Sequence, residues 1–244
     1  MDSPGALAQL KLAAALACAA VSLTGLTFWA DFRSWKQFGT GGTPPTLKGY
    51  IKIRRWGLYL LFKRQNLLDV SPIPDEGASY LDAESIPVRE GSRPSLTRWT
   101  LPQRQHPTPI STKTTSYLDN LMQDFATSST FSPYITSGPS KTEGGTGHAV
   151  YIRPEVDTIN PNAHKIFYEV AHVHPTDHSL HVYASTKDAR LVIEKGWGAR
   201  FPVEWLAPSS WIMVYAPRDD GEAKVVNDIV RAAVCFAAGK DIKE

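Results

Sequence analysis

Four histidines fall within ten residues of this 244-residue chain, at His172, His174, His178 and His181. The surrounding residues predict a strand through the first two. Because side chains alternate along a strand, His172 and His174 should share one face, about 6–7 Å apart. Residues 175–177 predict a hairpin turn that returns His181 beside them. The sequence therefore predicts three imidazoles gathered on one face of a sheet.

This cluster suits either acid–base or metal chemistry. Imidazole titrates near neutral pH and can take a proton from an enol or phenol. It is also a ligand for Zn, Fe, Cu and Ni. Asp177 or Glu169 could complete a set of two histidines and one carboxylate. Glu169 should nevertheless point to the opposite face, because it lies three residues before His172.

Three interpretations of the cluster follow. We expect acid–base catalysis by His172, His174, His181 and Asp177, without a cofactor. A divalent metal bound by the three histidines is the alternative, although no metal is favoured. Hydrogen-bonded histidines with a purely structural role are the third interpretation.

The carboxy-terminal hundred residues predict the elements that would hold the cluster. Apolar runs predict strands at residues 148–153, 165–173, 179–184 and 211–216. Capping residues and helical periodicity predict helices at 116–126, from Ser185 to Lys195, and from Asp219 to Gly239. Residues 70–110 and 127–147 are predicted to be irregular. Because strands and helices alternate without βαβ repeats, the predicted class is α+β, with a mainly antiparallel sheet packed with helices.

One amino-terminal transmembrane helix is predicted to precede this domain. Residues 12–30 carry no charge, and 19 helical residues nearly span the ~30 Å hydrocarbon layer of a membrane. A cleaved signal peptide and a buried core helix are the alternatives. The predicted organisation is an amino-terminal tail at 1–11, the anchor at 12–30, a linker at 31–48 and an α+β domain at 49–244.

The charge distribution indicates the side of the membrane and argues against one class of partner. Basic residues outnumber acidic ones just after the anchor, which favours a single-pass protein with a cytosolic body. Residues 50–63 are basic and amphipathic, typical either of a segment in the headgroup layer or of an ordinary buried element. With 26 basic and 24 acidic side chains the net charge is only +2, so we expect no nucleic-acid partner.

Four segments carry a family resemblance. They are REGSRPSLTRWTLPQRQ (89–105), EVAHVHPTDHSLH (169–181), EKGWGARFPV (194–203) and WIMVYAPRDDGEAKVV (211–226). In this order behind an amino-terminal anchor, they resemble the fungal luciferase family over roughly residues 45–238. The resemblance implies a small-molecule substrate and O2. Luminous members oxidise the α-pyrone 3-hydroxyhispidin through an endoperoxide that loses CO2, with no organic cofactor.

The resemblance also implies roles for particular side chains. A histidine of the cluster would deprotonate the hydroxypyrone, and the resulting anion would react with O2. Further candidates would stabilise negative charge or stack on the substrate, although each could instead serve packing. These substrate-binding candidates are Arg93, Lys195, Trp197, Arg200, Tyr215 and Arg218.

One position departs from the luminous pattern. Luminous members have a histidine after GWG-x-R, where this chain has Phe201, which cannot carry a proton or bind a metal. We therefore expect a luciferase-like oxygenase acting on a small hydroxypyrone or phenolic, polyketide-type substrate, and light emission is not favoured. A metal-dependent enzyme built on the histidines and a non-catalytic, membrane-tethered binding protein are the alternatives.

Overall fold

The centre of the protein is one six-stranded sheet. The computed structural model describes residues 4–157 and 160–243. The strands lie in the order β1-β2-β3-β4-β6-β5, and every neighbouring pair is antiparallel. Their bounds are β1 (Ile135–Pro139), β2 (His148–Ile152), β3 (Glu169–Val173), β4 (Leu180–Tyr183), β5 (Gly198–Arg200) and β6 (Trp211–Val214). With the helices packed on this sheet, the predicted α+β class is confirmed.

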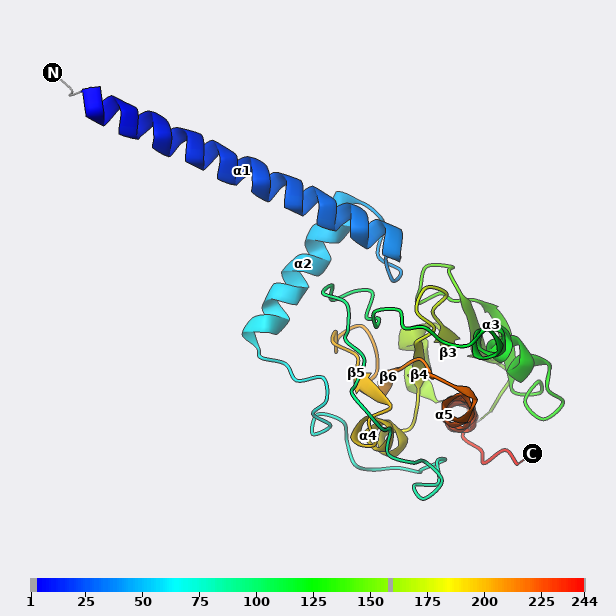
Figure 1. Cartoon of the computed structure of the whole chain (residues 1–244). Coiled ribbons are helices and arrows are strands. Elements are labelled where there is room, and N and C mark those ends of the chain that lie inside the picture. Colours follow the sequence, from blue (N-terminus) through cyan, green and yellow to red (C-terminus); the bar gives the residue numbers. More distant parts are fainter. Residues whose placement is uncertain (1–3, 158–159, 244) are drawn as a thin grey trace.

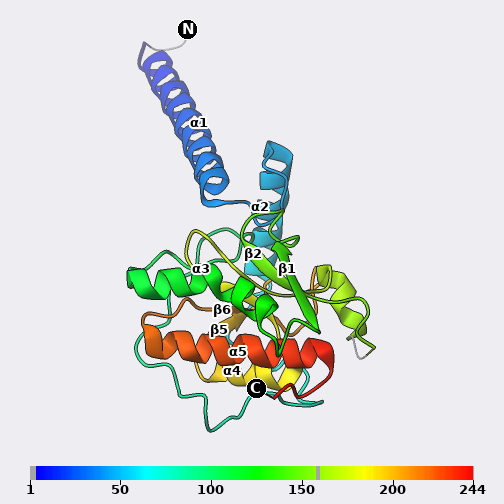
Figure 2. The same cartoon turned by 90° about the vertical axis from the view of Figure 1, so that its right-hand side faces the viewer.

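Three helices cover one face of the sheet, as Figure 2 shows. They are α3 (Thr112–Thr127), α4 (Thr186–Glu194) and α5 (Asp220–Ala238). The first turns of α4 and α5 are capped as predicted: Ser185 accepts the backbone N–H of Asp188 (3.1 Å), and Asp219 accepts that of Glu222 (2.9 Å). Gly239, with a φ of +64°, ends α5.

The opposite face of the sheet is also covered. Ala171 and Val173 of β3 pack into the apolar core beneath the helices, so His172 between them faces the other way. That face lies under irregular chain at residues 96–105 and under the 3-10 helix η1 (Pro161–Ile166). All residues of β3 are therefore buried, and polar side chains on this second face are shielded from bulk water.

A buried carboxylate holds part of the irregular chain to the sheet. Asp188 of α4 accepts the hydroxyl of Ser79 (2.6 Å) and the backbone N–H groups of the two residues that follow it (3.0 and 3.2 Å). An asparagine at this position would replace one acceptor oxygen by an N–H2 group, so some of these O–H and N–H donors would lose their hydrogen-bond acceptor. We expect Asp188→Asn to lower the free energy of unfolding by about 2 kcal/mol. Denaturant titration tests this, and a loss no larger than that of the exposed control Glu194→Gln would contradict it.

Two helices form an amino-terminal arm. In Figure 1, α1 (Pro4–Phe38) projects from the body, and α2 (Leu47–Phe62) starts beside its carboxy-terminal end. Within Leu7–Phe38, the most apolar 18-residue window has a mean hydropathy of 1.8 and is 0% buried. This helix is long and apolar enough to cross a membrane, and a signal sequence passes the same test.

The arm is packed against the body at the end of α1. Residues 31–38, predicted to be linker, continue α1 because Trp35 is buried against Tyr50 and Ile53 of α2. Trp35 also donates its indole N–H to the backbone carbonyl of Leu101 (2.9 Å). The rest of the predicted linker, which includes GTGGTPP (39–45), is therefore mainly a short connection between two helices.

One strand appears where the sequence predicts a loop. Residues 127–147 contain β1, whose order comes from pairing with β2, including the pair Ile135↔Ile152. Its Ser, Gly and Pro residues give no alternating apolar pattern, since β1 lies at the edge of the sheet and only Ile135 is fully buried. The prediction of irregular chain is wrong for these five residues.

Two further boundaries differ from the prediction. The short strand β5 was not predicted; Gly198 lets it approach β6 closely, because a Cβ there would lie 2.3 Å from the carbonyl oxygen of Met213. The strand predicted at 165–173 begins only at residue 169. Phe167 and Tyr168 have positive φ angles of 57° and 63°, which end η1 and interrupt extended chain.

Candidate active site

The β3–β4 hairpin brings three imidazoles into contact. His172 of β3 and His181 of β4 are direct partners across the antiparallel pair, and His174 follows the end of β3. His174 Nε2 lies 3.0 Å from His172 Nε2 and 3.1 Å from His181 Nδ1, and the last two atoms are 3.4 Å apart. All three rings are buried. His178 faces away, with its Nε2 3.4 Å from Asp119 of α3.

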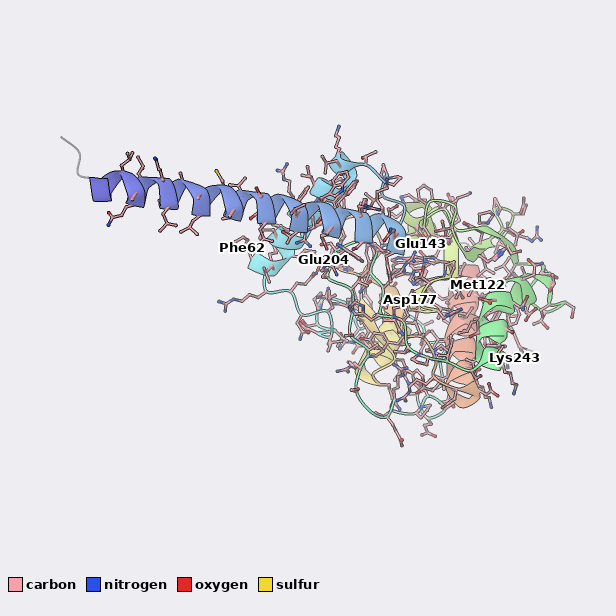
Figure 3. All side chains as sticks on the ribbon, turned by 45° about the horizontal axis from the view of Figure 1, so that its top comes forward. Phe62, Met122, Glu143, Asp177, Glu204 and Lys243 are labelled. Atoms are coloured by element: carbon pink, nitrogen blue, oxygen red, sulfur yellow. The ribbon has the colours of Figure 1, made fainter. Side chains whose placement is uncertain are left out.

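A carboxylate completes this group. Glu143 lies in the turn between β1 and β2, beside the end of α1, and its side chain is buried (Figure 3). Its Oε1 is 3.6 Å from His174 Nε2 and 3.7 Å from His172 Nε2, and its Oε2 accepts a hydrogen bond from Arg104. Glu143 with His172, His174 and His181 is called the His–Glu cluster below. Its four ligand-type atoms lie within 4.8 Å of one another.

A β-bulge places a second carboxylate behind His172. Regular alternation would turn Glu169 to the opposite face of β3. The pairing of β2 with β3 instead shifts: Val150 pairs with Ala171, but Tyr151 pairs with Glu169. The extra residue reverses the alternation, and Glu169 Oε1 lies 2.5 Å from His172 Nδ1. The expectation that Glu169 points away is therefore wrong.

In each ring, one nitrogen faces the other two imidazoles and is called inward, and the other points away and is called outward. The outward nitrogens of His174 and His181 also have partners. His174 Nδ1 lies 2.8 Å from Ser179 Oγ, which donates to Asp177 Oδ2 at 2.5 Å. His181 Nε2 lies 3.2 Å from Gln103 Oε1. Asp177, expected among the catalytic residues, thus stands behind the cluster and reaches His174 through a serine. Such partners fix the orientation of an imidazole and decide which of its nitrogens carries the proton.

Burial and neighbouring charges give the three rings different proton affinities. Burial disfavours the imidazolium form of His172, but the neighbouring carboxylates of Glu143 and Glu169 outweigh burial and raise the pKa of His172 to about 9. Burial lowers the pKa of His174. Burial and the two neighbouring rings hold the pKa of His181 well below its usual value. A proton on the cluster therefore resides on His172.

The two glutamates of the site favour their ionised forms. Burial opposes ionisation, yet the neighbouring imidazoles lower the pKa of Glu169 and hold that of Glu143 well below its usual value. Asp177 is a third buried acidic side chain next to the rings, and the buried guanidinium of Arg104 pairs with Glu143. Acidic side chains therefore outnumber the one guanidinium around the imidazoles.

The cluster lies in the wall of a cavity of about 370 Å³. His172, His181 and Glu143 line it, together with aromatic rings that contact His181. Trp211 stacks on His181 with centroids 5.6 Å apart and planes 11° apart, and Phe201 meets it edge-on at 5.5 Å and 83°. Apolar walls with a few convergent polar groups suit a small, flat ligand.

The arm and the body share this cavity. Residues 41–44, between α1 and α2, line it, as does Lys52 of α2. Lys141 and Lys165 add two further basic side chains, and Glu143 is the only acidic one among the lining residues that the structure describes. This charge pattern favours a ligand that is, or becomes, an anion.

The substrate-binding candidates lie outside this wall. Lys195 donates from Nζ to two carbonyl oxygens of residues 83–86 (2.9 and 2.8 Å). Trp197 is buried in the apolar core and donates its indole N–H to the carbonyl of Pro87 (2.7 Å). Arg93 lies 3.4 Å from the carbonyl oxygen of Ile193. These contacts attach irregular chain to α4 and its end.

The remaining three candidates have similar structural partners. The guanidinium of Arg200 donates to two carbonyl oxygens of residues 66–69 (3.1 and 2.7 Å). Tyr215 is buried next to β5 and β6, and Arg218 forms an ion pair with Glu222 at the start of α5. The residue after Arg200 is the one that reaches the cavity, as Phe201.

Several site residues were not anticipated from the sequence. Glu143 is the only acid between Asp124 and Glu155, and that isolation in a Ser/Thr/Gly-rich stretch is the one signal that points to it. Gln103 lies in a proline-punctuated segment, and Trp211 opens an apolar strand. Neither pattern indicates a site, because both residues reach the cluster through long-range contacts.

Fold and site together define the class: an α+β domain whose sheet carries a buried histidine–carboxylate site beside a small-molecule cavity. The family model described as Luciferase domain matches residues 168–233, from the start of β3 into α5. The luciferase of Neonothopanus nambi is 27% identical over 239 residues, covering 91% of this chain and 86% of the relative. Those of Armillaria ostoyae and Armillaria mellea are 26% and 23% identical, covering 91% and 93% of this chain and 87% and 91% of theirs. No solved structure matches significantly. The chain is therefore similar to fungal luciferases over most of its length, and residues 168–233 match the Luciferase domain.

Proposed function

We propose that this protein is an oxygenase that uses O2 to oxidise a small, flat hydroxylated ring, a hydroxypyrone or phenol, in the cavity beside the His–Glu cluster. The similarity to fungal luciferases supports a luciferase-like oxygenase in general terms. The observation that carries the finer proposal is the cavity itself. Histidine, glutamate, aromatic and lysine side chains all line it.

Shape and charge of the cavity support this substrate class. About 370 Å³ is near the lower end of ligand-pocket sizes, so a molecule of one or two rings fits. The indole of Trp211 and the edge of Phe201 offer flat apolar contacts. Lys141 and Lys165 would attract the anionic form of a ring hydroxyl from solution.

The proposed chemistry begins with the ring hydroxyl. The hydroxyl loses its proton to the His–Glu cluster, and the ring becomes an electron-rich anion. The electron pair of the anion forms a bond from ring carbon to O2, both oxygen atoms remain on the ring, and the O2 is reduced to the level of a peroxide. The proton held by the cluster is returned to the peroxide oxygen. The substrate itself supplies both electrons, so no organic reductant is needed.

Light emission is not included in this proposal. Phe201 places a hydrocarbon edge against His181, at the position where the luminous pattern has a histidine. The loss of a titratable group next to the cluster changes how the peroxide would be held.

The proposal is tested by oxygen uptake. The full chain, solubilised in detergent, is screened with an oxygen electrode against hydroxypyrones and phenols. We expect saturable oxygen consumption with at least one of them, in proportion to enzyme. Ligands that bind, as seen by quenching of tryptophan fluorescence, without any oxygen uptake would instead identify a non-catalytic binding protein and would overturn the proposal.

The lysines at the cavity edge give a separate prediction. Lys165→Gln removes an exposed charge that would attract the anion, so we expect KM to rise about threefold to tenfold, with little change in kcat. The difference should shrink at high ionic strength, because exposed charges are screened. Lys187→Gln, an exposed lysine of α4, is the matched control. Equal KM values for the two variants would contradict this role of Lys165.

The amino-terminal arm also supports a proposal for where the protein is located in the cell. We place α1 across a membrane and the body on the cytosolic side, with α2 in the headgroup layer. Exposed basic side chains gather in the first half of α2 and at its end, and exposed apolar ones mainly in its second half; they are Lys48, Lys52, Arg54, Arg55 and Lys63, with Ile51, Leu58, Tyr59, Leu61 and Phe62. We expect the chain to stay with membranes after alkaline carbonate extraction and to keep its amino-terminal segment by intact mass. A mature chain lacking that segment would identify a signal sequence instead.

A further inference from the structure

The inward nitrogens of the cluster are spaced like the ligands of one metal ion. His172 Nε2, His174 Nε2 and His181 Nδ1 are separated by 3.0, 3.1 and 3.4 Å. Nitrogens bound at 2.0–2.1 Å to a common ion stand about 2.9–3.4 Å apart, for angles between a right angle and the tetrahedral value. The three imidazoles thus already have the spacing of a coordination sphere.

The outward nitrogens show which atoms carry the protons. The oxygens of Glu169 accept hydrogen bonds from Ser140, Thr142 and Tyr151, so the ring nitrogen of His172 that faces this acceptor is a donor. Ser179 gives its own hydrogen to Asp177, so it accepts from the second ring. Gln103 presents its carbonyl oxygen to the third. Each ring therefore carries its proton on its outward nitrogen. The three inward nitrogens then face one another with lone pairs and no hydrogen between them.

A shared proton cannot satisfy this arrangement. One proton relieves one of the three nitrogen–nitrogen contacts and leaves the others without a hydrogen between them. One metal ion accepts all three lone pairs at once. Outward hydrogen bonds to a carboxylate, a hydroxyl and an amide oxygen are also the usual partners of metal-bound imidazoles, because they fix the tautomer and orient the ring.

Glu143 is placed as a fourth ligand. Its Oε1 points at the inward nitrogens, 3.6 Å from His174 Nε2 and 3.7 Å from His172 Nε2, while Arg104 holds its other oxygen. This leaves Glu143 to bind through a single oxygen. The side chains of Glu143 and Arg104 are only 5% and 2% exposed, so water contributes little to stabilising the carboxylate.

The surroundings of the cluster suit a cation. The buried carboxyl groups of Glu143, Glu169 and Asp177 lie next to the rings, with the buried guanidinium of Arg104 paired to Glu143. Carboxyl oxygens gathered in a buried site stabilise a cation held between them. Imidazole nitrogens select first-row transition metals over Mg²⁺ and Ca²⁺, which prefer oxygen ligands.

We infer that the His–Glu cluster is a binding site for one divalent first-row transition metal ion, coordinated by His172, His174, His181 and Glu143. Because His172, His181 and Glu143 also line the cavity, the ion would be accessible to a ligand there. This deepens the proposed function, since it concerns the same site, but it rests on the geometry of the cluster and not on any turnover. It replaces the cofactor-free expectation with a metal site.

The test is a cobalt titration of the tag-free full chain in detergent, after exhaustive chelation and dialysis. Co²⁺ in a site of nitrogen and oxygen ligands gives visible absorption bands. We expect saturation at one ion per chain, and X-ray absorption to show three imidazoles at about 2.0–2.1 Å. No saturable band at one equivalent would overturn the inference.

Variants assign the site to this cluster. We expect His181→Ala to weaken Co²⁺ binding by at least about 100-fold and Glu143→Gln by about 10-fold. Glu143→Gln keeps the shape of the side chain, so it remains informative if His181→Ala misfolds. His178→Asn, a histidine outside the cluster, should bind as the natural chain does. Equal affinities in all these proteins would overturn the inference.

Oxygen uptake measured on the same samples separates the two proposals. Metal binding without oxygen uptake leaves the metal site standing and removes the oxygenase. Full oxygen uptake by metal-free protein that also shows no saturable Co²⁺ binding leaves the oxygenase standing and overturns the metal site.

Discussion

Replacing His174 by alanine is expected to lower the rate of oxygen uptake by about 1,000-fold, within the range for loss of a positioned acid–base group. The nitrogen removed is the one that contacts both other inward nitrogens and lies nearest to Glu143. Its loss leaves His172 and His181 without their common neighbour, whether the cluster holds a proton or a metal ion. The measurement is the initial rate with the best substrate from the screen, at saturating concentration.

A neighbouring histidine supplies the control. His178 has a positive φ of 56° and pairs with Asp119 outside the cluster. Asparagine tolerates this backbone conformation, so His178→Asn should keep the natural rate to within about twofold. Circular dichroism establishes that both variants fold. A folded His174→Ala protein that keeps more than about one tenth of the natural rate would contradict a catalytic role for the cluster.

Removal of metal is expected to affect stability as well as activity. An ion that binds only the folded state stabilises it by about 2.7 kcal/mol at 100 times its dissociation constant. For a chain of this size that corresponds to a Tm higher by roughly 5–10 °C. We expect chelation to lower the Tm by this amount and the rate by about 100-fold, and added metal to restore both.

The stability change has its own control. His174→Ala lacks a ligand, so its Tm should respond to neither chelator nor metal. The natural chain and this variant are compared by thermal denaturation in the same detergent. If chelation shifts both proteins equally, the effect arises from another site and the metal prediction fails.

Local patterns in the sequence explain what was predicted correctly. The strands β3 and β4, the turn between them and the caps of α4 and α5 depend on neighbouring residues, and each was found near its predicted place. The pairing of His172 with His181 follows from the length of that turn. The convergence of three imidazoles was therefore accessible from the sequence.

Long-range contacts explain what was missed. Glu143 reaches the histidines only because β1 pairs with β2 and β2 with β3, and β1 has no apolar alternation of its own. The bulge that turns Glu169 behind His172 depends on pairing with β2, which no local pattern reveals. The carboxylates of the site are therefore set by tertiary structure.

The six substrate-binding candidates illustrate a different difficulty. Long cationic and aromatic side chains serve both ligand binding and packing, and the sequence does not distinguish the two. Lys195, Trp197 and Arg200 donate to backbone carbonyls of the irregular segments 66–69 and 83–87. Those acceptors lie more than 100 residues away along the chain. The structure gives these side chains a role in attaching irregular chain to the sheet.

The most direct test of substrate activation by the His–Glu cluster is an anaerobic titration with a hydroxypyrone, monitored through the absorption spectrum of the hydroxypyrone. Without O2 the reaction stops at the bound substrate, and the spectrum reports whether the ring hydroxyl is ionised. We predict that the natural chain binds the anion at a pH where the free compound is neutral, and that His174→Ala does not. A neutral spectrum on the natural chain, or the same anion on both proteins, would contradict the claim that the cluster activates the substrate.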